Sequence, residues 1–208
     1  MNARILIIEG TSGIGKSTLI DALVRKYISD NEKIRSLLHL AQAHTYGPLA
    51  IDEDHNALTK EMNIKHLLNI LQLLNWSVLS LDTERKVKFF CIIDTLHLTH
   101  CFRPGVLNWE DVVDYDSNLQ KLNCKLIFMH AQPQTIWDRG IAPRMNGQFI
   151  LEYGRKFGKN LKEIHQYFVD EQTKMENLLL KSGLEVLQID AENDFSQNVK
   201  KSYSFWID

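Results

Sequence analysis

The chain has 208 residues, with 24 lysines and arginines against 26 aspartates and glutamates, and a formal net charge of −2 at pH 7. This length predicts a single domain over 1–208. The charge argues against a nucleic-acid partner, since domains that bind nucleic acids are usually strongly basic. Three widely spaced cysteines do not predict a disulfide framework, and no apolar stretch approaches the roughly 20 residues of a membrane span. The composition therefore predicts a soluble, cytoplasmic protein with no membrane partner.

The first part of the chain predicts a strand, a glycine-rich loop and a helix. The continuous aliphatic run at 5–8 is typical of a strand buried on both faces of a parallel sheet. Beyond the glycines, apolar residues recur at helical spacing through 16–28. A second strand is predicted over 33–40. The Leu-rich stretch at 57–81 predicts one or two packed helices, which could serve the core or the interface of a homodimer.

The rest of the chain alternates strands with helices. Strands are predicted over 87–93, 125–129 and 184–189. Helices are predicted over 109–122, from Pro133 until Pro143 ends the helix, over 161–181 and over 195–203. The segment 146–160 carries three glycines and predicts a mobile surface segment. This alternation predicts a parallel sheet with right-handed crossovers in a three-layer α/β domain.

Residues 10–17 match the phosphate-loop pattern G-x-x-x-x-G-K-[ST] in full. Glycines let successive backbone N–H groups turn toward one anion, and the following helix adds the positive end of its dipole. Lys16 is expected to reach the β- and γ-phosphates, and Ser17 to ligate Mg²⁺. The loop therefore predicts a P-loop NTPase fold with strand order 2-3-1-4-5, and ATP and Mg²⁺ as cofactors. The predicted nucleotide-binding residues are Gly10, Thr11, Ser12, Gly13, Ile14, Gly15, Lys16, Ser17 and Thr18.

Two sequence signals of GTPases do not accompany this loop. The guanine-reading sequence Asn-Lys-x-Asp occurs nowhere in the chain. Asp94, at the end of the third predicted strand, is followed by Thr-Leu-His and not by the glycine of an Asp-x-x-Gly switch element. The sequence therefore argues against a GTPase.

The loop and its surroundings resemble the thymidylate kinase and deoxynucleoside kinase group of P-loop kinases. In that group a glutamate precedes the first glycine, as Glu9 does here. A strand at 126–129 followed by Pro133 and Arg139 matches the strand, the proline-started helix and the lid arginine of the group. The last strand runs into 189–191, near where the group packs the adenine. The resemblance implies a kinase for a nucleoside monophosphate or a nucleoside.

The acceptor half of the site departs from this group. The group usually has an aspartate where this chain has Ser12, and an arginine where Thr95 follows Asp94. After the second strand the group often shows Glu-Pro, whereas 41–46 reads Ala-Gln-Ala-His-Thr-Tyr. The small-molecule acceptor could therefore also be another alcohol, such as an antibiotic. Two alternatives stay open: a nucleotide-binding regulatory module without transferase activity, and a nucleic-acid-end kinase, against which the charge of −2 speaks.

Candidate catalytic residues follow from the chemistry of phosphoryl transfer. Asp94, at the carboxyl edge of the sheet, could accept the proton of the acceptor or hold Mg²⁺, and would otherwise cap a turn. Arg139 and Arg144, in a lid at about 134–160, could place positive charge over the phosphoryl group, or could be solvated surface arginines. The predicted catalytic residues are Lys16, Asp94, Arg139 and Arg144, with Ser17 and Asp94 at the metal. The predicted acceptor-binding residues are Glu9, Gln42, His44, Tyr46, His97 and Arg103.

Overall fold

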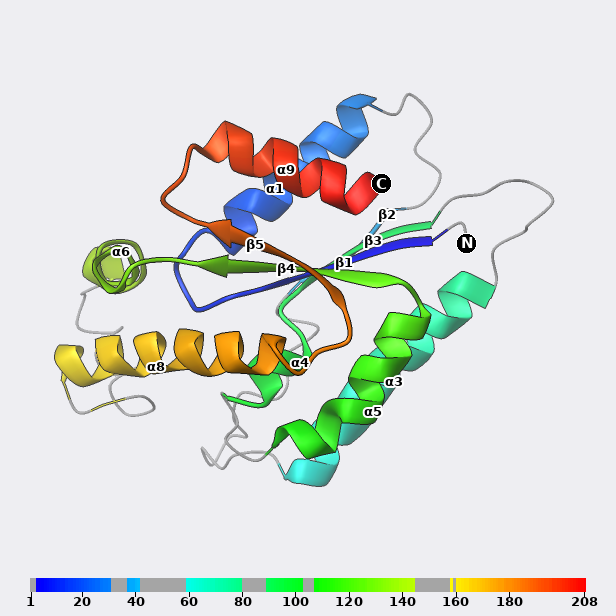
Figure 1. Ribbon diagram of the computed structural model, residues 1–208, viewed down its shortest axis with the longest axis horizontal. Helices are drawn as coiled ribbons and strands as arrows, with labels where there is room; N and C mark the ends of the chain where they lie inside the picture. Colours follow the sequence, from blue (N-terminus) through cyan, green and yellow to red (C-terminus); the bar gives the residue numbers. More distant parts are fainter. Residues whose placement is uncertain are drawn as a thin grey trace.

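A five-stranded parallel sheet forms the centre of the molecule (Figure 1). The structure is a computed structural model and describes residues 3–30, 37–41, 59–79, 89–102, 107–144, 158 and 160–208. The strands are β1 (Ala3–Glu9), β2 (Leu37–Leu40), β3 (Phe89–Asp94), β4 (Cys124–His130) and β5 (Glu185–Asp190). They lie in the order β2-β3-β1-β4-β5, so the predicted 2-3-1-4-5 topology is confirmed.

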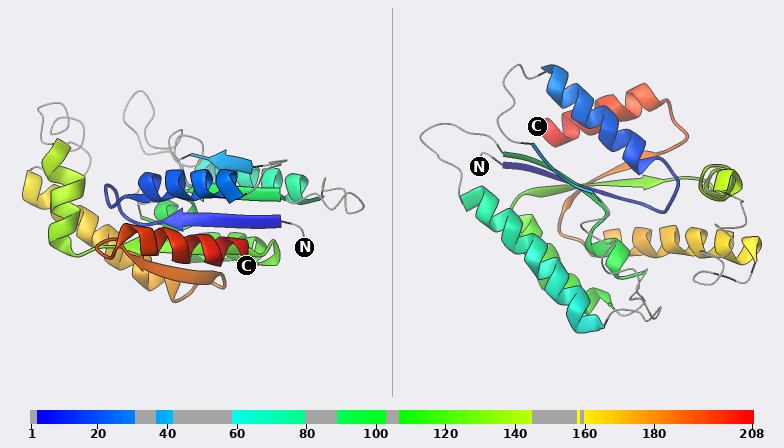
Figure 2. Two further views of the ribbon diagram at one scale, coloured as in Figure 1. Left: turned by 90° about the horizontal axis from the view of Figure 1, so that it is seen from above. Right: turned by 180° about the vertical axis from the view of Figure 1, so that it is seen from behind.

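Helices cover both faces of this sheet. One face carries α1 (Lys16–Asp30) and α9 (Phe195–Ile207), whereas α3 (Lys60–Leu79), α5 (Trp109–Lys121) and α8 (Leu161–Leu179) lie on the opposite side, as the two further views in Figure 2 also show. The predicted three-layer α/β fold is therefore confirmed. None of the described helices is both long and apolar enough to cross a membrane.

The aliphatic run of β1 explains how the sheet holds its two helical layers. Alternate side chains of a strand point to opposite faces. Ile5 and Ile7 belong to the core under α3 and α5, and Leu6 and Ile8 to the core under α1 and α9. Each of these side chains is at most 1% exposed, which stabilises the fold by about 1.5–3 kcal/mol per side chain. A central strand buried on both faces therefore requires four consecutive apolar residues.

The register of the central strands brings polar residues to one edge of the sheet. Ile8 of β1 pairs with Asp94 of β3, and Glu9 pairs with Phe128 of β4. The carboxyl ends of these strands therefore meet beside the loop that follows β1. This edge is where open α/β sheets bind their ligands.

The helical segment from Pro133 differs from the prediction. An α-helical turn, α6 (Pro133–Ile136), is continued by a π-helical turn (Trp137–Ile141) and a 3₁₀ turn (Ala142–Arg144). Pro143 therefore lies inside the 3₁₀ turn and does not end the segment directly. Proline lacks the N–H that a regular α-helix would use at this position. The change of helix type brings Gly140 against the phosphate loop.

Candidate nucleotide-binding site

The phosphate loop follows β1 and leads into α1. Gly13 has a φ of 84°, in the left-handed region that residues with a side chain rarely adopt. A Cβ atom at Gly13 would overlap the Cα of Gly140, so the lid-side backbone packs directly on the loop. Gly10, with a φ of 142°, similarly passes close to the carbonyl of Met129 at the end of β4. The loop therefore lies between two backbones that leave no room for side chains.

The side chain of Lys16 folds back over the phosphate loop. Its Nζ donates to the carbonyl oxygens of Gly10 at 2.7 Å and Thr11 at 2.9 Å, and the residue is buried. Ser17 and Thr18 follow in the first turn of α1 and are exposed. An ammonium group, exposed hydroxyls and the first N–H groups of a 15-residue helix therefore lie together at the loop.

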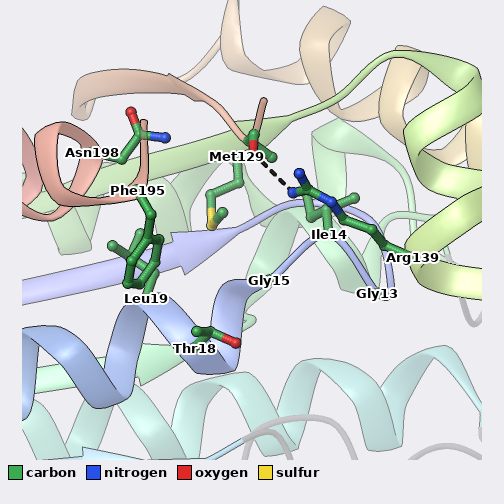
Figure 3. A pocket seen from close by; sticks show the side chains of 10 residues that line it. Gly13, Ile14, Gly15, Thr18, Leu19, Met129, Arg139, Phe195 and Asn198 are labelled. Atoms are coloured by element: carbon green, nitrogen blue, oxygen red, sulfur yellow. Dashed lines mark hydrogen bonds between the residues drawn. The ribbon is translucent and has the colours of Figure 1, made fainter. Parts of the chain in front are cut away.

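A pocket of about 250 Å³ opens beside the loop. Its walls are formed by the loop, α1, β4, the π-helical turn and the start of α9; its lining residues are Gly13, Ile14, Gly15, Thr18, Leu19, Met129, Arg139, Ala191, Phe195 and Asn198. Figure 3 shows Phe195 and Leu19 on one side of this pocket and Arg139 on the other. The Nη1 atom of Arg139 donates to the carbonyl oxygen of Ala191 at 2.8 Å. Apolar walls with one guanidinium group suit a flat, partly polar group next to an anion.

Asp94 lies at the end of β3, beside the loop. It is buried, and its Oδ1 accepts a hydrogen bond from the Thr95 hydroxyl at 3.0 Å. Thr95 has a φ of 67°, unusual for a β-branched residue, and its N–H donates to the carbonyl oxygen of Ile8 at 2.9 Å. Strained residues of this kind cluster at functional sites, where the surrounding structure holds them. The strained turn fixes Asp94 at the edge of the site.

Glu9 holds the segment that follows Asp94. Its carboxylate is fully buried and accepts hydrogen bonds from the N–H groups of Leu96 (2.8 Å) and Leu98 (3.2 Å) and from the hydroxyl of Thr99 (2.7 Å). These donors belong to the short helix α4 (His97–His100) and to the residue before it. Burial raises the pKa of Glu9 above its ordinary value of 4.5, although Thr99, His97, Leu96 and Lys16 partly oppose the shift. Glu9 thus positions the turn after β3, and its predicted contact with an acceptor stays a prediction.

His97 lies in the interior and not on the wall of the described pocket. It is fully buried, and its Nε2 bonds with Asp116 Oδ1 on α5 at 2.9 Å. Asp116 also accepts from the Ser182 hydroxyl and the Gly183 N–H, at 2.6 Å and 2.8 Å. Burial raises the pKa of Asp116, but these three hydrogen bonds and the charge interaction with His97 outweigh it and leave that pKa below its ordinary value. The contacts give His97 a role in tying α4 to α5, and acceptor binding by His97 stays a prediction.

The remaining predicted residues fall in different parts of the chain. Gln42, His44, Tyr46 and Arg103 lie outside the described residues, as does most of the predicted lid at 134–160. Arg144 ends the 3₁₀ turn, and only its backbone is described. Their roles stay predictions.

Glu171 on α8 is a residue of the site that the sequence did not indicate. Its Oε2 accepts a hydrogen bond from the hydroxyl of Thr11 in the phosphate loop, and the carboxylate is fully buried. The two residues are 160 positions apart. No local pattern around Glu171 distinguishes it from the other acidic residues of an amphipathic helix.

The described residues offer few protein ligands for a metal ion. Across the described ranges, no group of three or more His, Cys, Asp and Glu side chains could hold one. Mg²⁺ usually keeps several waters and binds through substrate phosphates with one or two protein ligands. An exposed Ser17 hydroxyl at the loop, with Asp94 at the neighbouring strand end, fits such a sparse site.

Comparison with known proteins shows that the fold is similar to that of a solved structure. No protein-family model and no curated protein matches the chain. Among solved structures, it is similar to the crystal structure of the YorR protein from Bacillus subtilis in complex with phosphorylated GDP. The TM-score is 0.58 and the sequence identity 17%, over 98% of this chain and 95% of that chain. At this identity the likeness shows the fold alone, and it extends over nearly the whole length of both chains.

Proposed function

We propose that the chain is a phosphotransferase that moves the γ-phosphoryl group of a nucleoside triphosphate to a small-molecule acceptor. The phosphate loop carries this proposal, because Lys16 and the glycine backbone lie together at the N-terminus of α1 and beside a pocket. The resemblance to thymidylate and deoxynucleoside kinases favours a nucleoside monophosphate or a nucleoside as the acceptor. Asp94, buried at the adjacent strand end, supports a transferase over a simple binding module.

ATP is the expected donor, and GTP is a second candidate. The sequence resemblance favours ATP. The similar structure from Bacillus subtilis contains phosphorylated GDP, which favours testing guanine nucleotides as well. The pocket beside the loop, walled by Ile14, Leu19, Met129 and Phe195, would take the base of either nucleotide through apolar contact.

The residues of the site suit an in-line displacement. The acceptor hydroxyl oxygen would attack the γ-phosphorus, the bond from this phosphorus to the β,γ-bridging oxygen would break, and the proton of the hydroxyl would pass to Asp94. Lys16 would exchange its loop carbonyls for phosphate oxygens, and Arg139 would add positive charge from the pocket wall. Mg²⁺, held by Ser17 and by Asp94 through water, would neutralise phosphate charge.

A nucleotide-binding module without transferase activity is the second candidate. Thr95 stands where the thymidylate and deoxynucleoside kinases that the sequence resembles have an arginine. Its hydroxyl donates to Asp94 Oδ1 at 3.0 Å. This contact occupies part of the carboxylate that would otherwise face an acceptor. The candidate therefore predicts nucleotide binding without turnover.

The two candidates are separated by a transfer assay with γ-³²P-labelled ATP and GTP. Nucleosides, nucleoside monophosphates and aminoglycoside- or chloramphenicol-type alcohols serve as acceptors. We expect one acceptor class to become labelled, Lys16→Ala to abolish labelling, and Asp94→Asn to lower kcat by about 10²–10⁴-fold with the Kd of the donor little changed. Lys26→Ala, at a partly exposed position ten residues beyond Lys16 on α1, is the control and should retain full activity. Nucleotide binding without labelling would favour the regulatory module, and unchanged transfer by Lys16→Ala would contradict the mechanism.

A further inference from the structure

Three neighbouring residues of α8 each contact a different loop around the site. Glu171 accepts a hydrogen bond from Thr11 of the phosphate loop. Gln172 bonds both backbone groups of Ala131, after β4, accepting from its N–H at 2.9 Å and donating to its carbonyl oxygen at 3.1 Å. Lys174 donates to the carbonyl oxygen of Cys101, at the end of α4, at 2.9 Å. One turn of α8 thus contacts the phosphate loop, the residue after β4 and the end of α4.

Glu171 differs from its two neighbours because it is fully buried. A buried carboxylate is costly unless hydrogen-bond donors surround it, so a chain that keeps one gains something other than hydrophobic stability from it. The Thr11 hydroxyl supplies such a donor from the loop itself. Side chains that bond a buried charge are held more firmly than those that bond a neutral acceptor.

A second part of the loop also packs against a neighbouring element. Gly140, in the π-helical turn, packs its backbone on Ser12 and Gly13. Thr11 and Gly13 are therefore each held by a different contact, Thr11 by a hydrogen bond and Gly13 by backbone packing. The N–H groups that would point at a phosphate belong to this loop and to the first turn of α1.

We propose that Glu171 is a positioning residue of the nucleotide site. Its carboxylate holds Thr11 and so fixes the directions of the loop N–H groups before a nucleotide arrives. Glu171 acts through Thr11 and does not itself touch the ligand. This inference rests on the proposed function, because it assigns the residue that preorganises the same phosphate site.

A double-mutant cycle tests the pair. Thr11→Val removes the hydroxyl at nearly constant shape, and Glu171→Met removes the carboxylate with a side chain of similar size. The Kd of Mg·ATP and Mg·GTP is measured by titration calorimetry for the full-length wild type, both single variants and the double variant. Amide hydrogen exchange of residues 11–17 is measured on the same proteins without nucleotide. Glu171→Gln, which keeps an acceptor oxygen, tests rescue, and Thr173→Val on the exposed side of α8 is the control.

We expect each single variant to weaken nucleotide binding by about tenfold, as loss of a hydrogen bond to a charged group does. The double variant should bind no more weakly than either single variant, because one interaction is lost in all three. Loop amides should exchange faster in all three, Glu171→Gln should lie between wild type and Glu171→Met, and Thr173→Val should match wild type. Losses that multiply in the double variant, or loop exchange unchanged by Glu171→Met, would overturn the inference. A wild-type protein that binds neither nucleotide would instead contradict the proposed function, and the exchange data would still decide the role of Glu171.

Discussion

Glu9 is a single carboxylate that connects the phosphate loop with the acceptor side of the site. It directly precedes the loop, and its oxygens hold Leu96, Leu98 and Thr99. The turn that carries Asp94 is therefore attached to the same residue from which the loop begins. A change at Glu9 should therefore alter both the phosphate loop and the turn that carries Asp94.

The buried position of Glu9 gives folding stability a defined dependence on pH. Burial raises the pKa of Glu9 in the folded protein above 4.5, so the folded state binds this proton more tightly than the unfolded state. The resulting stabilisation is fully present below the unfolded pKa and is lost as the pH rises through the folded pKa. We therefore expect the free energy of unfolding of the wild type to fall, relative to Glu9→Gln, as the pH rises from about 4.5.

Urea unfolding at a series of pH values measures this difference. Glu61→Gln makes the same chemical change at an exposed position of α3 and serves as the control. Parallel stability curves for the wild type and Glu9→Gln would show that Glu9 carries no such linkage.

The residues of the site differ in how far sequence alone predicts them. The phosphate loop is a contiguous motif, so its residues and its place between a strand and a helix could be read directly. Glu171 and Thr11 lie 160 positions apart, and no local pattern joins them. The position of His97 after β3 predicts a site residue, and the structure adds a buried contact with Asp116 that the sequence does not indicate. Side-chain direction after a strand depends on tertiary contacts that spacing does not encode.

At the scale of elements, strands were more predictable than short helices. The aliphatic runs of β1, β3 and β4 are buried on both faces and stand out in the sequence. The sequence does not predict the four-residue helix α4. Its first turn is held by Glu9, which accepts hydrogen bonds from the N–H groups of Leu96 and Leu98, 87 and 89 positions later in the chain. The sequence predicts a helix after Pro133, but no local pattern predicts the π and 3₁₀ geometry that places Gly140 on the phosphate loop.

The C-terminal helix α9 depends on one buried aromatic side chain. Trp206 is 1% exposed, packs against Tyr27 of α1 and Phe90 of β3, and donates from Nε1 to the carbonyl oxygen of Arg4 at 3.3 Å. Trp206→Ala should lower the free energy of unfolding by about 3–5 kcal/mol, because it leaves a cavity between helix and sheet. Trp76→Ala, on α3, is the matched control: this side chain is 69% exposed, and its loss should change stability by at most about 0.5 kcal/mol. Chemical denaturation of both variants provides the measurement, and equal losses would contradict the packing of α9.

At the scale of the whole molecule, the near-zero net charge agrees with a protein that handles a small polyanion. The chain carries a formal charge of −2, yet Lys16 and Arg139 lie at one loop and its pocket. Positive charge placed inside a site can bind a triphosphate without a basic surface. The homodimer, the cytoplasmic location and the absence of a nucleic-acid partner stay predictions from the sequence.

The central claim is that the loop at 10–17 binds the phosphates of a nucleoside triphosphate. Titration calorimetry with Mg·ATP and Mg·GTP tests it most directly, with wild type, Gly13→Ala and the control Gly183→Ala. The nearest neighbour of the methyl group added at Gly183 is the flexible side chain of Gln120. We predict one nucleotide bound per chain by the wild type and by Gly183→Ala, and loss of binding in Gly13→Ala, where a methyl group meets the backbone of Gly140 at a φ of 84°. A wild-type protein that binds neither nucleotide, or a Gly13→Ala variant that binds as tightly as wild type, would contradict this claim.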